Sequence, residues 1–200
     1  MTMISRRVVL ACICGLPGCR RPALEQEEML PDFGPLPEFS FTAHTGRPFT
    51  RASLQGKVWI LDFIYTHCTL VCPRMTAEMR KLQQQTKQIA QARLLSVSID
   101  PDRDTVPVLA AYAASHGADA SRWLFLTGDK AEIRRMQVAT QRHLDPEDIA
   151  THSKQIYLVD GSGFVRGVYS VVQPGALADV MEDLQKLIRN PRKPEPEPES

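Results

Sequence analysis

The nearly continuous apolar run VWILDFIY, at residues 58–65, is the stretch that most constrains the fold. Apolar residues at successive positions of a strand indicate burial on both faces, as in a parallel sheet covered by helices. Two further runs, LLSVSID at 94–100 and WLFLTG at 123–128, have the same character. Helical patterns separate these runs, so the sequence predicts one α/β domain whose sheet lies between helices.

Shorter signals place the remaining elements around this sheet. A small hairpin is predicted to turn at Thr45-Gly46, and a second hairpin, within 154–170, turns about residues 161–163. Helices are predicted after residue 72, from about 105 to 117, over about 130–142, and near the C-terminus. The first of these helices carries Met75 and Met79 on one apolar face, a stripe that predicts core packing rather than copper-binding thioethers.

Two cysteines, Cys68 and Cys72, lie four positions apart between the first apolar run and Pro73. Proline fits the first turn of a helix, so the helix is expected to begin near residue 71 or 72. The positive end of that helix should favour thiolates, the form that attacks disulfides and binds soft metals. The spacing alone leaves a reversible disulfide and a metal site both open, and a metal would need a third ligand.

Three ordered motifs resemble the Sco/SenC proteins, which are thioredoxin-like copper-binding proteins that help assemble cytochrome c oxidase. The motifs are FIYTHCTLVCPRM at 63–75, SIDPDRDTVPVLAAY at 98–112 and THSKQIYLVDGSGFVRGVY at 151–169, and the resemblance extends from about residue 39 to 188. It implies a thioredoxin-like fold, with a central mixed sheet flanked by helices and an N-terminal β-hairpin. Thr69 departs from the proline that many members have after the first cysteine.

The resemblance also implies that Cys68, Cys72 and His152 bind copper. Thiolates suit Cu(I) and imidazole suits both Cu(I) and Cu(II), so this donor set fits both oxidation states. The implied function is a metallochaperone that delivers copper to the binuclear copper centre of cytochrome c oxidase without turning over a substrate. The alternative is a thiol–disulfide reductase that keeps the cysteines of the copper-bearing oxidase subunit reduced, and only the metallochaperone needs His152. Expected partners are that subunit and a periplasmic copper donor or thiol reductant.

Asp62 interrupts the first apolar run six residues before Cys68. Thioredoxins have a buried acid at this spacing that helps to move protons, and burial would raise the pKa of Asp62 and suit it to accept a proton. The alternative is an acid that is hydrogen-bonded at the sheet face. Asp100 and Asp104 are expected to end a strand and cap a helix, held by Arg103, with Thr105 as the other candidate for the cap. The alternative is an acidic rim for docking a partner or for metal entry.

The other histidines carry weaker signals. His67 adjoins Cys68 and is placed to tune the thiol electrostatically, with metal ligation as the alternative. His44, His116 and His143 have no motif around them and are expected to be surface or capping residues.

Residues 1–19 are predicted to be an export signal or lipoprotein leader. Arg6 and Arg7 precede a short apolar run, and Leu16-Pro17-Gly18-Cys19 resembles a lipobox, in which Cys19 would be lipidated. This leader predicts a domain on the periplasmic face of the bacterial cytoplasmic membrane, with membrane contact only through the N-terminal anchor.

The rest of the chain divides into a tether, one domain and a tail. Residues 20–37 are predicted to be the tether, 38–190 the copper-binding domain, and 191–200 a disordered tail of proline and glutamate. The formal net charge of +1 gives no basic stripe for nucleic acid. Only two cysteines lie in the body of the chain, which excludes a disulfide scaffold.

Overall fold

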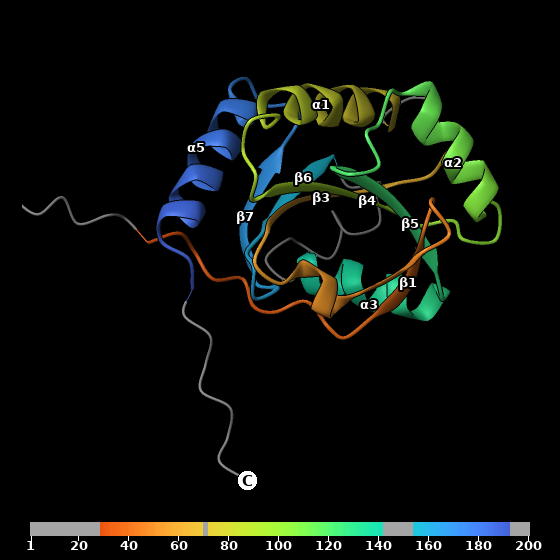
Figure 1. The fold of residues 1–200 in the computed structure, drawn as a ribbon, viewed down its shortest axis with the longest axis horizontal. Helices are drawn as coiled ribbons and strands as arrows, with labels where there is room; N and C mark the ends of the chain where they lie inside the picture. Colours follow the sequence, from red (N-terminus) through yellow and green to blue (C-terminus); the bar gives the residue numbers. More distant parts are fainter. Residues whose placement is uncertain (1–28, 70–71, 142–153, 193–200) are drawn as a thin grey trace, which may run out of the picture.

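The computed structural model describes residues 29–69, 72–141 and 154–192. Its centre is a seven-stranded sheet with the order β2-β1-β5-β4-β3-β6-β7 (Figure 1). The strands are β1 (Ser40–Ala43), β2 (Pro48–Thr50), β3 (Val58–Ile64), β4 (Ala92–Ser98), β5 (Trp123–Gly128), β6 (Gln155–Val159) and β7 (Val165–Ser170). Strands β3, β4 and β5 are parallel, and the outer strands pair antiparallel with their neighbours. The predicted mixed sheet and N-terminal hairpin are therefore confirmed.

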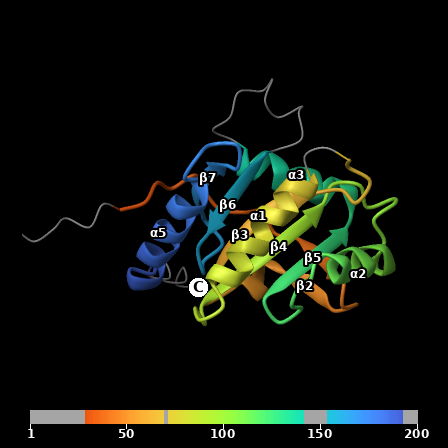
Figure 2. The ribbon, with the colours of Figure 1, turned by 90° about the horizontal axis from the view of Figure 1, so that it is seen from above.

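Helices cover both faces of the sheet. They are α1 (Cys72–Gln85), α2 (Val106–Ser115), α3 (Lys130–Thr140), α5 (Ala176–Arg189) and the short 3-10 helix η1 (Arg51–Leu54). Figure 1 shows α1, α2 and α5 on one face of the sheet and α3 with η1 on the other. Seen from above in Figure 2, α1 crosses the central strands, with α2 on the β5 side and α5 on the β7 side. Within the described ranges, no helix combines the length and apolar character needed to cross a bilayer.

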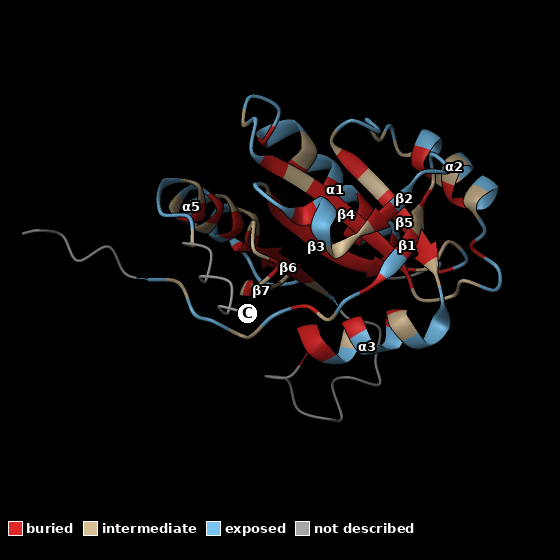
Figure 3. Ribbon diagram, turned by 60° about the horizontal axis from the view of Figure 1, so that its bottom comes forward, coloured by how far each residue is buried: buried red, intermediate tan, exposed pale blue. Residues whose placement is uncertain are grey.

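Strand β3 divides the core into two layers by simple alternation. Ile60 and Ile64 face α1 and pack with Met75 and Met79, while the alternate residues face α3 and η1. Both methionines are at most 1% exposed, which confirms that their stripe forms core. Figure 3 shows the buried residues concentrated in the central strands, as the continuous apolar run predicted.

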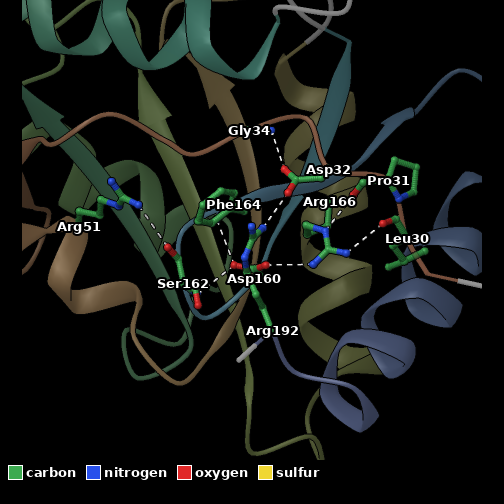
Figure 4. A network of polar contacts seen from close by, with 10 residues as sticks. All are labelled: Leu30, Pro31, Asp32, Gly34, Arg51, Asp160, Ser162, Phe164, Arg166 and Arg192. Carbon is green, nitrogen blue, oxygen red and sulfur yellow. Dashed lines mark hydrogen bonds and ion pairs between the residues drawn. The ribbon is translucent and has the colours of Figure 1, made fainter. Parts of the chain in front are cut away.

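The domain begins earlier than residue 38, the start predicted from the sequence. Residues 30–36, here called the strap, lie along the start of β7 (Figure 4). Arg166 donates from Nε to the carbonyl of Pro31 at 2.8 Å and from Nη2 to the carbonyl of Leu30 at 2.9 Å. The other end of the strap inserts Leu36 into the core at 1% exposure. This part of the predicted tether is therefore built into the fold.

The arginine that binds the strap, Arg166, also forms an ion pair with Asp160. Arg166 Nη1 lies 3.2 Å from Asp160 Oδ2, and the two side chains are 12% and 3% exposed. The other oxygen of Asp160 accepts hydrogen bonds from the backbone of Ser162 and Phe164 in the β6–β7 turn. Asp32 of the strap adds a 2.7 Å ion pair with Arg192. The strap thus connects residues from both ends of the described chain.

Candidate metal and dithiol site

The two cysteines meet where β3 ends and α1 begins. Cys68 lies in the connecting loop, and Cys72 is the first residue of α1, so the predicted helix start is confirmed. The backbone N–H of Cys72 donates to Cys68 Sγ at 3.3 Å. Both residues are thiols, and they are only 8% and 3% exposed. The first turn of α1 therefore holds one sulfur against the backbone of the other cysteine.

Burial reverses the expected ionisation of Cys72. Loss of solvent raises the pKa of this thiol to about 12, and the neighbouring Cys68 and Asp62 act in the same direction. A hydrogen bond with the backbone of Tyr65 only partly offsets this rise. The prediction that the helix end would favour a thiolate is wrong for Cys72, because the cost of burying a charge exceeds the stabilisation by the helix dipole.

Asp62 lies on the face of β3 that is covered by α1 and is completely buried. Its Oδ1 accepts a hydrogen bond from Ser96 Oγ at 2.5 Å, and Ser96 in turn accepts one from Trp123 Nε1 at 2.9 Å. Its Oδ2 has no hydrogen-bond partner among the described residues. Burial raises the pKa of Asp62 to about 7, so this carboxyl exchanges its proton near neutral pH.

Asp104 holds the loop that precedes the cysteines. This fully buried carboxylate accepts hydrogen bonds from the backbone N–H of Thr66 at 3.1 Å and from Thr66 Oγ1 at 2.5 Å. Ser98 Oγ donates a third at 2.5 Å. Of the two candidate caps predicted for α2, Asp104 and Thr105, the N-cap is Thr105. Because Asp104 is buried, it forms no docking rim, and it instead positions the backbone two residues before Cys68.

The neighbouring acid has a different environment. Arg103 lies 3.7 Å from Asp100 rather than from Asp104, so the expected pairing with arginine applies only to Asp100. The Asp100 side chain remains 27% exposed, and its backbone N–H donates to Ser98 Oγ at 3.1 Å. Asp100 thus ends the β4 segment at the surface.

The histidines fall into three groups. His152 and His143 lie outside the described residues, so the third predicted copper ligand has no described position. His44 Nδ1 accepts a hydrogen bond from the backbone of Phe125 at 3.1 Å, and His116 packs on Tyr112 with ring centroids 4.4 Å apart. His67 keeps a side chain that is 58% exposed beside Cys68.

Some neighbours of the thiols were not singled out from the sequence. Tyr65 interacts with Cys68, and this hydrogen bond is the first cause that raises the pKa of the Tyr65 phenol. Ser96 reaches Asp62 from the adjacent strand β4, and Trp123 of β5 in turn donates to Ser96. Ser96 is a polar residue within β4, but Arg93 and Ser98 are polar residues of the same strand, so the pattern alone does not single it out. Nothing in the local pattern indicates the orientation of Trp123.

The two described sulfurs are suitable donors for a soft metal such as Cu(I). A metal would displace the thiol protons, because cysteine binds metals as thiolate. Within residues 29–69, 72–141 and 154–192, no group of three or more His, Cys, Asp or Glu side chains is arranged to hold a metal ion. A third protein ligand must therefore come from outside these ranges or by a rearrangement within them.

A sequence model of the SCO1/SenC family matches residues 31–189. The chain belongs to this family. The match includes the whole described sheet and all of the strap except Leu30. Within it lie both cysteines and the segment that contains His152.

Individual SCO1/SenC relatives agree with the fold. A SCO1/SenC family lipoprotein from Bacillus anthracis is 34% identical, with a TM-score of 0.68, over 76% of this chain and 94% of that one. BsSco, described as having a disulfide switch and as a member of the Sco family of cytochrome c oxidase assembly proteins, is 30% identical, with a TM-score of 0.71, over 82% and 99%. A putative copper-binding protein from Stutzerimonas stutzeri is 28% identical over 92% and 95% of the two chains. The thioredoxin-like fold is thereby confirmed.

Proposed function

We propose that this protein is a copper metallochaperone that delivers copper to the binuclear centre of cytochrome c oxidase during its assembly. The observation that carries the proposal is the pair of recessed sulfurs at the start of α1, with Cys72 N–H donating to Cys68 Sγ at 3.3 Å. Relatives described as copper-binding or as oxidase assembly proteins support this choice of metal and recipient.

Cys68 and Cys72 bind copper through sulfur in this proposal, and His152 supplies a nitrogen donor. Sulfur stabilises Cu(I), and the imidazole extends the site to Cu(II). Copper is the cargo, so the site must also release it to the copper-bearing oxidase subunit. A resting Cys72 thiol with a pKa of about 12 favours release, because regaining its proton competes with the metal.

The first test measures the copper that a reduced full-length chain retains after excess Cu(I) is removed, in a background with serine at positions 12, 14 and 19 so that only Cys68 and Cys72 remain. This background should retain about one copper, and Cys72→Ser within it should lose tight binding because one of two sulfurs is gone. His116→Gln is the matched control, since it changes a histidine that packs on Tyr112. Tight copper retention in a Cys68→Ser/Cys72→Ser double variant would refute this site.

The second candidate is a thiol–disulfide reductase that acts on the cysteines of the oxidase subunit. Asp62 is the observation that favours it, because a buried carboxyl with a pKa of about 7 can accept the proton that Cys72 must lose when a disulfide forms. BsSco, whose description includes a disulfide switch, supports a reversible bond between Cys68 and Cys72.

His152→Ala separates the two candidates, because thiol exchange needs only the cysteines. The metallochaperone predicts lost Cu(II) absorption and lost oxidase activity in cells, with thiol exchange near the wild-type rate. Normal oxidase assembly without His152 would favour the reductase instead.

We also propose that the domain acts at the periplasmic face of the cytoplasmic membrane. The basic and apolar pattern of residues 1–19 supports this location, as does the lipoprotein relative from Bacillus anthracis. In fractionated cells, wild type should be found with the membrane and Cys19→Ala should become soluble if lipidation supplies the anchor. Recovery of wild type in the cytoplasm would contradict export.

A further inference from the structure

The imidazole of His67 stands exposed directly before two recessed thiols. Its side chain is 58% exposed, whereas Cys68 and Cys72 are 8% and 3% exposed. We infer that His67 is the entry ligand for Cu(I), which its Nε2 atom takes from a copper donor before the metal reaches the two sulfurs. This inference rests on the proposed copper function and adds a residue that acts during loading.

Hydrogen-bond accounting fixes which nitrogen of His67 can bind metal. Asp104 Oδ1 is a carboxylate acceptor, so the 2.5 Å contact with Thr66 Oγ1 uses the single proton of the threonine hydroxyl. Thr66 Oγ1 also lies 3.2 Å from His67 Nδ1. Because the hydroxyl proton is already used, Nδ1 must be the donor of this second bond.

The second oxygen of Asp104, Oδ2, is hydrogen-bonded in the same way. Ser98 Oγ donates to Asp104 Oδ2 at 2.5 Å and accepts from the backbone N–H of Asp100 at 3.1 Å. The hydroxyls of Thr66 and Ser98 therefore both donate their proton to Asp104, and each accepts a hydrogen bond from a different N–H donor. In a neutral imidazole with its proton on Nδ1, the lone pair is on Nε2.

This arrangement is the one that metal-binding histidines use. A histidine ligand commonly donates its second ring N–H to an oxygen, which fixes the tautomer and raises the basicity of the ligating nitrogen. Asp104 acts on His67 through Thr66, and its Oδ1 also lies 3.9 Å from Nδ1.

His67 does not complete a resident site with the cysteines, since no such three-residue group occurs in the described ranges. Its position instead suits the first step of a ligand exchange. A donor–copper bond breaks as the Nε2–Cu(I) bond forms, and the Nε2–Cu(I) bond then breaks as the metal passes to the adjacent Cys68 and to Cys72. Each thiol releases its proton as its sulfur–copper bond forms, and copper remains Cu(I) throughout.

The test follows Cu(I) transfer from its complex with bicinchoninate to the reduced full-length chain by stopped-flow absorbance. His67→Ala should slow transfer by at least about tenfold, because losing the ligand should cost no less than disturbing the groups that support a metal ligand. The equilibrium affinity for Cu(I) should stay at its wild-type value, because the resident sulfurs are unchanged. Free imidazole added to His67→Ala should restore part of the lost rate.

Further variants separate loading from folding. His67→Asn keeps a polar side chain but no imidazole, so it should be as slow as His67→Ala. Thr66→Val removes the acceptor for Nδ1 and should slow transfer less, because the ring is retained. His116→Gln is the matched control and should load at the wild-type rate.

Two results would overturn the inference without touching the proposed function. One is a wild-type transfer rate in both His67 variants. The other is a loss of equilibrium affinity in His67→Asn as large as in Cys72→Ser, which would make His67 a resident ligand. If wild type takes no Cu(I) from the complex at all, the proposed copper function itself fails.

Discussion

The free energy of unfolding of wild type should fall as the pH rises from about 4 to about 7, because Asp62 is buried. Replacing Asp62 by asparagine should abolish this fall. The folded chain holds the pKa of Asp62 at about 7, against an ordinary value of 3.8. This difference of about three pH units, at 1.36 kcal/mol each, corresponds to about 4 kcal/mol. The carboxyl is completely buried, so solvent screening does not reduce this figure.

The direction follows from the protons bound in each state. Below pH 3.8 both the folded and the unfolded Asp62 are protonated, and the group has no effect on the pH dependence. Between 3.8 and about 7 the unfolded state ionises while the folded state keeps its proton, so stability falls as the pH rises. Above about 7 both states are ionised and the loss is complete.

The assay is urea unfolding of the reduced chain across this range of pH. Asp62→Asn should gain about 4 kcal/mol relative to wild type between the acidic and alkaline ends, because other titrating groups cancel in the comparison. The asparagine amide lacks a partner where Oδ2 stood, which adds a constant cost at every pH. Asp102→Asn, at an exposed ion pair with Lys130, is the control and should show no such trend. A pH-independent difference between Asp62→Asn and wild type would refute the raised pKa.

Two further predictions test other parts of the fold. In a chain with serine at positions 12, 14, 19 and 68, Cys72 is the one remaining cysteine, and the pH dependence of its alkylation should have a midpoint above 9.0, because burial is the first cause of its raised pKa; a midpoint at or below 9.0 would contradict this. Arg166→Gln should reduce the free energy of unfolding by about 3 kcal/mol, since it leaves Asp160 buried without its cation. It should also speed amide exchange at Leu36, and the same stability loss in the exposed Arg103→Gln would show that the effect is not specific to the strap.

The sheet and its order of elements were largely predictable because β3 and its neighbours carry strong local signals. The run at 58–65 has no polar face, and only a strand covered on both sides accommodates it. The strap was not predictable in the same way. The position of the strap depends on Arg166, which lies 136 residues from Leu30 in the sequence. No local sequence pattern indicates such a distant partner.

In the candidate site, too, the features set by local sequence were predictable and those set by distant residues were not. The spacing of Cys68 and Cys72 before a proline predicted their place at the start of α1, because that rule is local. The pKa of Cys72 could not be predicted from the helix end alone, because burial by distant segments decides it. Asp104 and Thr105 were both candidate caps for α2; Thr105 takes this position, and Asp104 instead binds Thr66, 38 residues earlier. Helix-end rules therefore located the start of both helices, but they gave neither the pKa of Cys72 nor the partner of Asp104.

The strap also affects how copies of this chain meet one another. An open strand edge can recruit a strand from a second molecule, and β7 is the last strand on its side of the sheet. Here the N–H and carbonyl of Val165 are already bonded to Gly34 and Phe33, so the start of that edge has no vacant backbone groups to offer. At the opposite side β2 spans only three residues and begins with Pro48, which has no N–H. The strap occupies the start of the β7 edge and the β2 edge is short, so both sides of the sheet are poor templates for edge-to-edge association into fibres.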